Sequence, residues 1–134
     1  MTDRRIPLDV AEFLRDQIQT YEQLEIVVRI GRDPAREYVI ASLVKDLNMD
    51  SATGAAVMDQ LSAAGVLTIT RDVAGDRVRC QENVEALAAR LTEVYDSDRI
   101  QLISQMTQDA LERVRTSALR TFSSAFLLGR KRDG

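Results

Sequence analysis

The stretch IASLVKDLNMDSATGAAVMDQLSAAGVLTITRDVAGDRVR, residues 40–79, decides the fold of this chain. It begins with a helical pattern that runs into the turn Asn48-Met49-Asp50-Ser51, and a second helical pattern follows and ends at Gly65. Residues 67–71 then alternate in polarity and are rich in β-branched side chains, and residues 77–80 return after a polar turn at 72–76. A helix, a turn, a second helix and a two-stranded wing, in this order, predict a winged helix-turn-helix.

Two residues mark the ends of the second helix in this stretch, and a glycine inside it indicates close packing. Asp50 is well placed as the N-cap of the helix over residues 51–64, because its carboxylate can accept from free backbone N–H groups. Gly65 predicts the C-terminal stop of that helix. Gly54 lies inside the helix, where glycine costs about 1 kcal/mol against alanine. We therefore expect Gly54, with Met58 and Leu61, to face inward where the preceding helix approaches closely.

The flanking segments read as helices, so the predicted fold is mainly α, with long N- and C-terminal helices around the winged core. Apolar residues recur at helical spacing over residues 8–30, either as one helix or as two with a bend near Thr20. The next helix is expected to begin near Arg36 or Ile40 and to end at Leu47. Further helices are expected over residues 82–95 and 99–128, separated by Asp96-Ser97-Asp98. The expected organisation is an N-terminal helical segment (1–30), a winged core (31–80), C-terminal helices (81–128) and a flexible tail (129–134).

Composition limits the class of protein. A chain of 134 residues with 45% hydrophobic content fits one globular domain, and it has no apolar run long enough to span a membrane. No apolar signal core follows Met1, so a cytoplasmic location is the expectation. Of the 18 basic residues 16 are Arg, and alanine is abundant, as is typical of a GC-rich bacterial genome.

The residues needed for catalysis or for a cofactor are scarce. The chain has no His and one Cys, Cys80, so the usual nitrogen and sulfur ligands of a metal site are missing. No Ser or Cys is paired with an evident base, and phosphate-loop and dinucleotide motifs are absent. We therefore expect no enzyme activity, no metal and no cofactor, and we interpret Cys80 as a small buried residue.

The segment from Tyr21 to Cys80, about 60 of the 134 residues, resembles the MarR-type winged-helix regulators. The resemblance rests on a helix ending near Gly31-Arg32-Asp33-Pro34, the Leu43 to Ser51 turn region, Leu61 with Gly65-Val66-Leu67, and Gly75-Asp76-Arg77 at the wing. It implies a homodimeric DNA-binding repressor in which the terminal helices pair two subunits, and some members of the family are released by small ligands.

Candidate DNA-binding residues lie on the second helix of the motif and on the wing. On the helix, Gln60 could bond an adenine edge and Thr53 could touch a thymine methyl or a phosphate. On the wing, Arg71, Arg77 and Arg79 could contact phosphates or the minor groove, and Arg77 is the strongest candidate. The alternative for these arginines, and for Arg71 in particular, is a solvated strand pair balanced by nearby aspartates.

Charge keeps a second interpretation open. The helix over residues 51–64 has no Lys or Arg, and the net charge of −3 is carried by residues 1–80 (10 basic, 13 acidic), residues 81–100 (2 basic, 5 acidic) and residues 101–134 (6 basic, 3 acidic). A duplex-binding protein usually presents a basic face. The leading hypothesis is therefore a DNA-binding transcriptional regulator, and the alternative is a winged-helix module that docks on another protein.

A long C-terminal helix favours a homodimer. A helix of about 30 residues cannot bury a full apolar stripe against so small a body, so a second chain is the expected cover. The predicted interface residues are Ile100, Ile103, Val114, Phe122 and Phe126.

Overall fold

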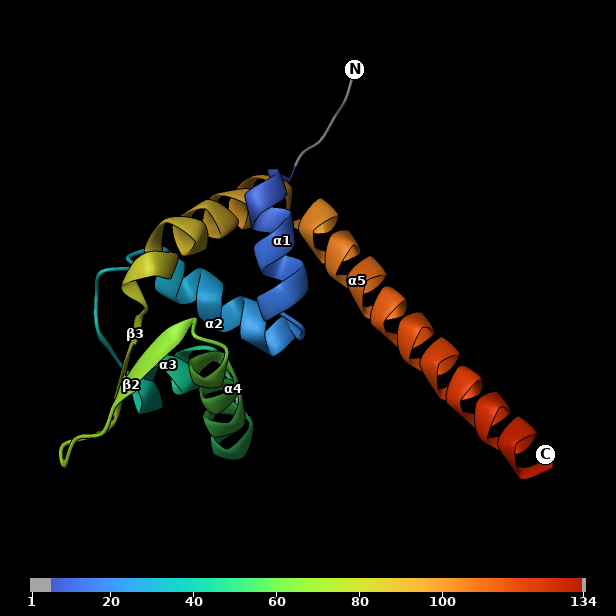
Figure 1. Cartoon of the computed structure of the whole chain (residues 1–134). Coiled ribbons are helices and arrows are strands. Elements are labelled where there is room, and N and C mark those ends of the chain that lie inside the picture. Colours follow the sequence, from blue (N-terminus) through green and yellow to red (C-terminus); the bar gives the residue numbers. More distant parts are fainter. Residues whose placement is uncertain (1–5, 134) are drawn as a thin grey trace, which may run out of the picture.

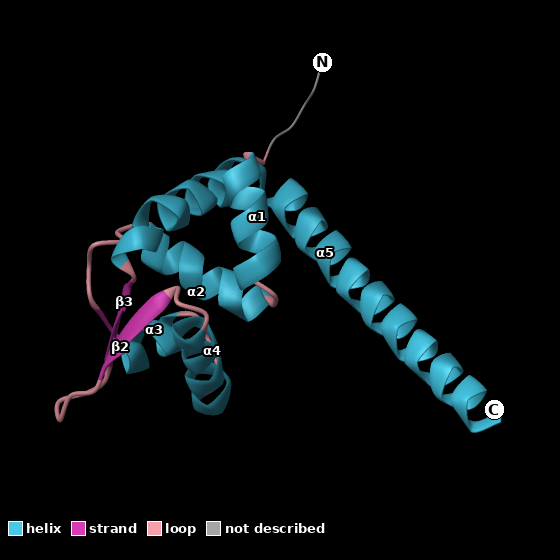
Figure 2. Ribbon diagram, viewed as in Figure 1, coloured by secondary structure: helices cyan, strands magenta, loops and turns pink. Residues whose placement is uncertain are grey.

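The structure is a computed structural model that describes the backbone of residues 6–133 and the side chains of residues 6–123. A small sheet lies at one side of a helical body, and one long helix leaves that body (Figures 1 and 2). In chain order the elements are α1 (Leu8–Gln17), α2 (Tyr21–Gly31), β1 (Tyr38–Val39), α3 (Ile40–Asp46), α4 (Ser51–Ala63), β2 (Leu67–Thr70), β3 (Arg77–Cys80), the 3-10 turn η1 (Glu82–Val84) and α5 (Glu85–Asp133).

The N-terminal segment forms two helices that separate near Thr20, the second of the two alternatives that the sequence left open. The hydroxyl of Thr20 accepts from the backbone N–H of Gln23, and the side chain of Gln23 accepts from the backbone N–H of Thr20. This reciprocal capping box satisfies free donors at the start of α2 and separates that helix from α1. Both helices turn buried side chains, such as Leu14 and Leu24, into one core.

The helix-turn-helix forms as predicted between α3 and α4. Asp50 caps α4 by accepting from the backbone N–H of Thr53 at 3.0 Å. Gly54, Met58 and Leu61 are buried, as expected. A Cβ placed at Gly54 would lie 2.6 Å from a methyl carbon of Val44 on α3, which confirms that the two helices approach closely at this glycine. Gly65, with φ of 82°, ends the helical region in the left-handed conformation that glycine tolerates.

The sheet has three strands rather than the two predicted. Its order is β1-β3-β2 and both pairs are antiparallel, with Tyr38 opposite Val78 and Ile69 opposite the same Val78. The suggested helix start at Arg36 is therefore wrong, and α3 begins at the alternative, Ile40. Strand β1 is only two residues long, and its pairing with β3 depends on a partner about 40 positions away, so no local pattern marks it.

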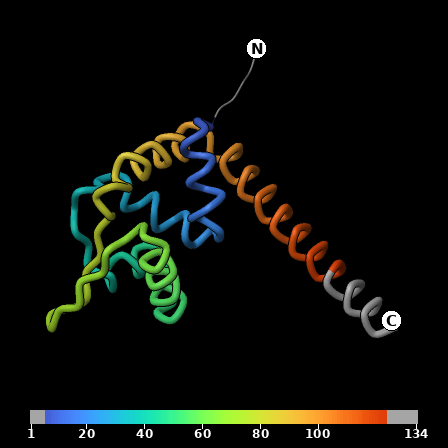
Figure 3. Tube along the Cα trace, viewed as in Figure 1, coloured from blue at the N-terminus to red at the C-terminus, as the bar shows by residue number. Residues whose placement is uncertain are grey.

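The last helical region bends where the sequence predicted a break. Asp98 has non-helical backbone angles (φ −153°, ψ 61°) and divides α5 into two arms. The first arm packs on α2, where the hydroxyl of Thr92 donates to the carbonyl of Val28, and buries Leu91. Leu102, just beyond the bend, is also buried, and α5 contacts α1 as well. The second arm then extends away from the body (Figures 1 and 3). Among the described residues, no helix is both long enough and apolar enough to cross a membrane.

Candidate nucleic-acid interface

Helix α4 and the wing both lie on the side of the molecule away from the start of α1 (Figures 1 and 3), and α4 packs on β2, the strand that leads into the wing. One side of α4 is buried, and the opposite side leaves small residues and one acid exposed: Ser51, Ala52, Ala55, Ala56 and Asp59. The wing joins β2 to β3 through residues 71–76, with Val73 fully exposed at its tip. An exposed helix beside a β-hairpin is the geometry with which winged-helix proteins meet the grooves of duplex DNA.

Both predicted base-reading residues are exposed, and both are held by bonds within the chain. The hydroxyl of Thr53 donates to Asp50 at 2.9 Å as part of the helix cap. The amide oxygen of Gln60 accepts from the side-chain nitrogen of Gln23 on α2, also at 2.9 Å. Gln23 is itself buried and belongs to the capping box. Gln60 therefore braces α4 against α2, a contact between residues 37 positions apart that the sequence did not suggest.

The three wing arginines lie at the predicted positions, and each is paired with a carboxylate. Arg71 donates to Asp76 at 2.6 Å and lies 3.8 Å from Asp59 on α4. The hydrogen bond from Arg71 lowers the pKa of Asp76 below its ordinary value, so Asp76 stays ionised at neutral pH.

Arg77 and Arg79 are paired in the same way. Arg77 donates to Glu37, just before β1, at 3.3 Å and approaches Asp72 at 3.8 Å. Arg79 lies 3.8 Å from Glu85, at the start of α5. The aspartates at 72 and 76 could be anticipated as balancing charges, whereas the pair with Glu37 joins residues 40 positions apart and left no local signal.

The charge of this part of the chain is acidic overall. Residues 37–79 carry four basic side chains (Lys45, Arg71, Arg77, Arg79) and six acidic ones (Glu37, Asp46, Asp50, Asp59, Asp72, Asp76). Their arithmetic sum is −2, so the usual basic footprint of a duplex-binding surface is missing. Any attraction for phosphates depends on how the individual arginines are placed.

A groove lies beside α4, between α3, the first turn of α4 and the base of the wing. Its volume is about 740 Å³, and its lining combines apolar side chains, among them Ile40 and Met49, with the charged Lys45, Asp50 and Asp76. Apolar walls with a few polar groups are typical of a surface that accepts another molecule.

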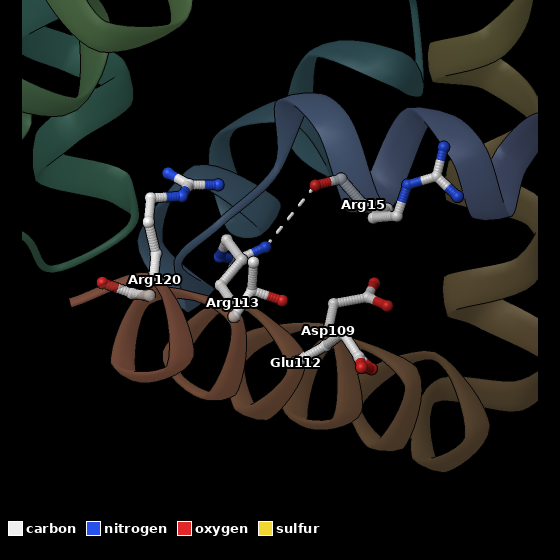
Figure 4. Close-up of a pocket in the computed structure, with 7 residues that line it drawn as sticks. Arg15, Asp109, Glu112, Arg113 and Arg120 are labelled. Atoms are coloured by element: carbon white, nitrogen blue, oxygen red, sulfur yellow. Dashed lines mark hydrogen bonds between the residues drawn. The ribbon is translucent and has the colours of Figure 1, made fainter. Parts of the chain in front are cut away.

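A second cleft, of about 390 Å³, separates the end of α1 from the extended arm of α5 (Figure 4). Arg113 donates to the backbone carbonyl of Arg15 at 3.5 Å across it, and Asp109, Glu112 and Arg120 complete its charged lining. Asp109 accepts from Gln105 through one oxygen, while its other oxygen is buried without a hydrogen-bond partner.

The predicted dimer residues differ in their surroundings. Ile100, Val114 and Phe122 are exposed at 83%, 66% and 69% of their surface, whereas Ile103 packs partly against the core. Phe126 lies outside the described side chains, as do those of the basic tail. Leu111 and Leu119 are further exposed apolar residues on the same arm, outside the predicted set.

Cys80 is buried within the sheet, at 1% exposure. Burial, and secondly the charge of Glu85, raise the pKa of its thiol to about 11. A thiol in this environment stays protonated and shielded at neutral pH, which fits the interpretation of a small core residue. Among the described residues no group of three or more Cys, Asp or Glu side chains is arranged to hold a metal ion.

No protein-family model matches this sequence, and no curated protein matches it either. Solved structures do match. The MarR family transcriptional regulator SPO1453 from Silicibacter pomeroyi has a TM-score of 0.54 at 22% identity, over 88% of this chain and 84% of that chain. MepR from S. aureus in complex with DNA has a TM-score of 0.55 at 15% identity, over 86% of both chains.

Transcriptional regulator Tm0710 from Thermotoga maritima has a TM-score of 0.50 at 20% identity, over 95% of this chain and 87% of that chain. Identities this low are informative about architecture and not about activity. Each match covers more than four-fifths of both chains. The chain therefore has the MarR-like winged-helix fold.

Proposed function

We propose that the protein is a homodimeric transcriptional regulator that binds duplex DNA, with the wing on the phosphate backbone and α4 at the major groove. The observation that carries this proposal is the exposed α4 beside a hairpin bearing Arg71, Arg77 and Arg79. The same fold occurs in MepR, a solved structure of which is a DNA complex. The proposed role includes no catalytic step, because the chain has no His and its one thiol is buried. We further propose that this regulator acts in the cytoplasm of a bacterial cell.

The exposed arm of α5 supports the dimer in this proposal. Leu111, Val114, Leu119 and Phe122 are all more than half exposed on the described part of that arm. Apolar side chains gathered along one helix gain stability when a second helix covers them. A dimer would present two wings and two copies of α4 to one DNA duplex.

The experiment is a binding assay with mixed genomic fragments at low salt. Arg77→Ala should weaken binding to all sequences alike, because a phosphate contact carries no sequence information. Gln60→Ala should instead reduce the preference for one sequence. Arg90→Ala, which removes an arginine that pairs with Asp9 across α1 and α5, is the matched control and should leave binding unchanged. No binding by the wild-type protein would overturn the proposal.

A second candidate function is docking on another protein. It is favoured by the net acidic charge of residues 37–79 and by the apolar groove beside α4. Ala56→Lys separates the two candidates, because Ala56 is on the exposed side of α4 and the lysine adds a positive charge there. Binding to DNA should become tighter in this variant if α4 faces phosphates. An unchanged, undetectable DNA affinity in both proteins would favour docking.

A further inference from the structure

The wing arginines are held in two small networks of ion pairs that span different elements. Arg71 lies between Asp76 in the wing turn and Asp59 on α4, so a single guanidinium connects the wing to the helix beside it. Arg77 lies between Glu37, which precedes β1, and Asp72 at the other end of the wing turn. Both arginines are therefore shared between two carboxylates.

Asp76 is held in place by its surroundings, so it offers a fixed acceptor to Arg71. Its backbone carbonyl accepts from the N–H of Ile40 at 2.9 Å, at the junction of β1 and α3. Its second carboxylate oxygen accepts a long bond, 3.4 Å, from the backbone N–H of Asp72. Guanidinium groups bind carboxylates and phosphates through the same fork of donors, so a carboxylate held beside Arg71 can compete with a phosphate for that arginine.

We infer that these carboxylates form an internal latch, in which Asp76 and Asp59 occupy Arg71, and Glu37 occupies Arg77, until phosphates of the DNA displace them. The inference rests on the proposed DNA-binding function and adds its regulation: the chain limits its own affinity for DNA. Changes that weaken the latch, such as the loss of one carboxylate, should tighten binding without creating a new contact.

The expected effect is moderate because the pairs are exposed. Side chains of Arg71 and Asp59 are each about two-thirds exposed, and such pairs are weakened by water and salt. Freeing one arginine should tighten DNA binding about two- to fivefold per protomer. A dimer that engages both wings should therefore gain about four- to 25-fold in total.

The test measures the affinity of the full chain for a generic DNA duplex at low salt by fluorescence anisotropy. Asp76→Asn should bind more tightly than the wild type, and it keeps an amide oxygen for the wing turn. Asp59→Asn is the second variant, and it leaves the turn untouched. Asp46→Asn is the control, because it removes a carboxylate that pairs with Arg29 rather than with a wing arginine. Any gain in DNA affinity in this variant measures the effect of removing a negative charge alone.

A double-mutant cycle identifies the cause of any gain. If Asp76 acts by occupying Arg71, Asp76→Asn should give little gain in the Arg71→Ala background. If Asp76 only repels phosphates, the gain should be the same in both backgrounds, and the latch is refuted. Equal binding by the wild type and both Asn variants also refutes the latch while the proposed function stands. No binding by any variant overturns the proposed function and the latch together.

Discussion

Gly54→Ala tests the packing that presents α4. The new methyl group would lie 2.6 and 2.7 Å from the two methyl carbons of Val44, far inside ordinary contact distance. Rotation of the Val44 side chain would not relieve this contact. Valine has one strongly preferred rotamer in a helix, and on rotation one methyl group moves toward the position that the other leaves. Overpacking costs about 1–3 kcal/mol, and so close a contact with two methyl carbons at once belongs at the upper end of that range, about 2–3 kcal/mol. Alanine regains about 1 kcal/mol of helix propensity, so we expect a net loss of roughly 1–2 kcal/mol.

Thermal and urea denaturation measure this loss. A loss of that size should lower the melting temperature by roughly 3–10 °C in a chain of this length. The control is the double variant Gly54→Ala with Val44→Ala, in which the obstructing methyl groups are gone. The two changes should be strongly non-additive, with the double variant more stable than the sum of the single effects by at least about 1 kcal/mol.

Two results would refute this reasoning. One is a Gly54→Ala protein as stable as the wild type, which would mean that α3 and α4 separate at no cost. The other is additivity within about 0.5 kcal/mol in the double variant. A loss that Val44→Ala does not relieve would have to arise elsewhere than at this contact.

Three further predictions concern assembly, the thiol and the helix cap. Light scattering should find a dimer at micromolar concentration. The double variant Val114→Asp with Phe122→Asp should be a monomer that keeps its helical circular dichroism. A monomeric wild-type protein would contradict the proposed dimer. Cys80, with its pKa raised to about 11 by burial, should resist thiol reagents at neutral pH until the chain unfolds, so rapid labelling of the native protein would contradict its placement. The pKa of Asp50 is lowered, first because the backbone N–H of Thr53 donates to its carboxylate. The charged carboxylate therefore stabilises the fold above about pH 4, and this contribution is lost as the pH falls through the folded-state pKa. Urea denaturation should therefore show a stability difference between the wild type and Asp50→Asn that shrinks on acidification, and a difference independent of pH would count against the charge.

The parts of the fold that the sequence predicted depend on local physics. Asp50 and Gly65 act through hydrogen bonds and backbone angles within a few residues, so composition and spacing reveal them. The capping residues Thr20 and Gln23 likewise explain the bend between α1 and α2. The close approach at Gly54 was predicted because a glycine inside a helix needs a packing reason.

The parts that the sequence did not predict depend on partners far along the chain. Strand β1 exists because Tyr38 pairs with Val78, and a two-residue strand has no periodicity to detect. The bond from Gln23 to Gln60 and the pair of Arg77 with Glu37 also cross long separations. Candidate contact residues could therefore be named from the sequence, but the partners that already hold them could not.

The salt dependence of DNA binding tests the central claim most directly. If Arg71, Arg77 and Arg79 each neutralise one phosphate, the slope of log K against log salt should be roughly −5 to −6 for a dimer. Arg77→Ala should flatten that slope by about 1 per subunit. No detectable binding at about 50 mM salt, or a slope that Arg77→Ala leaves unchanged, would contradict DNA binding through the wing.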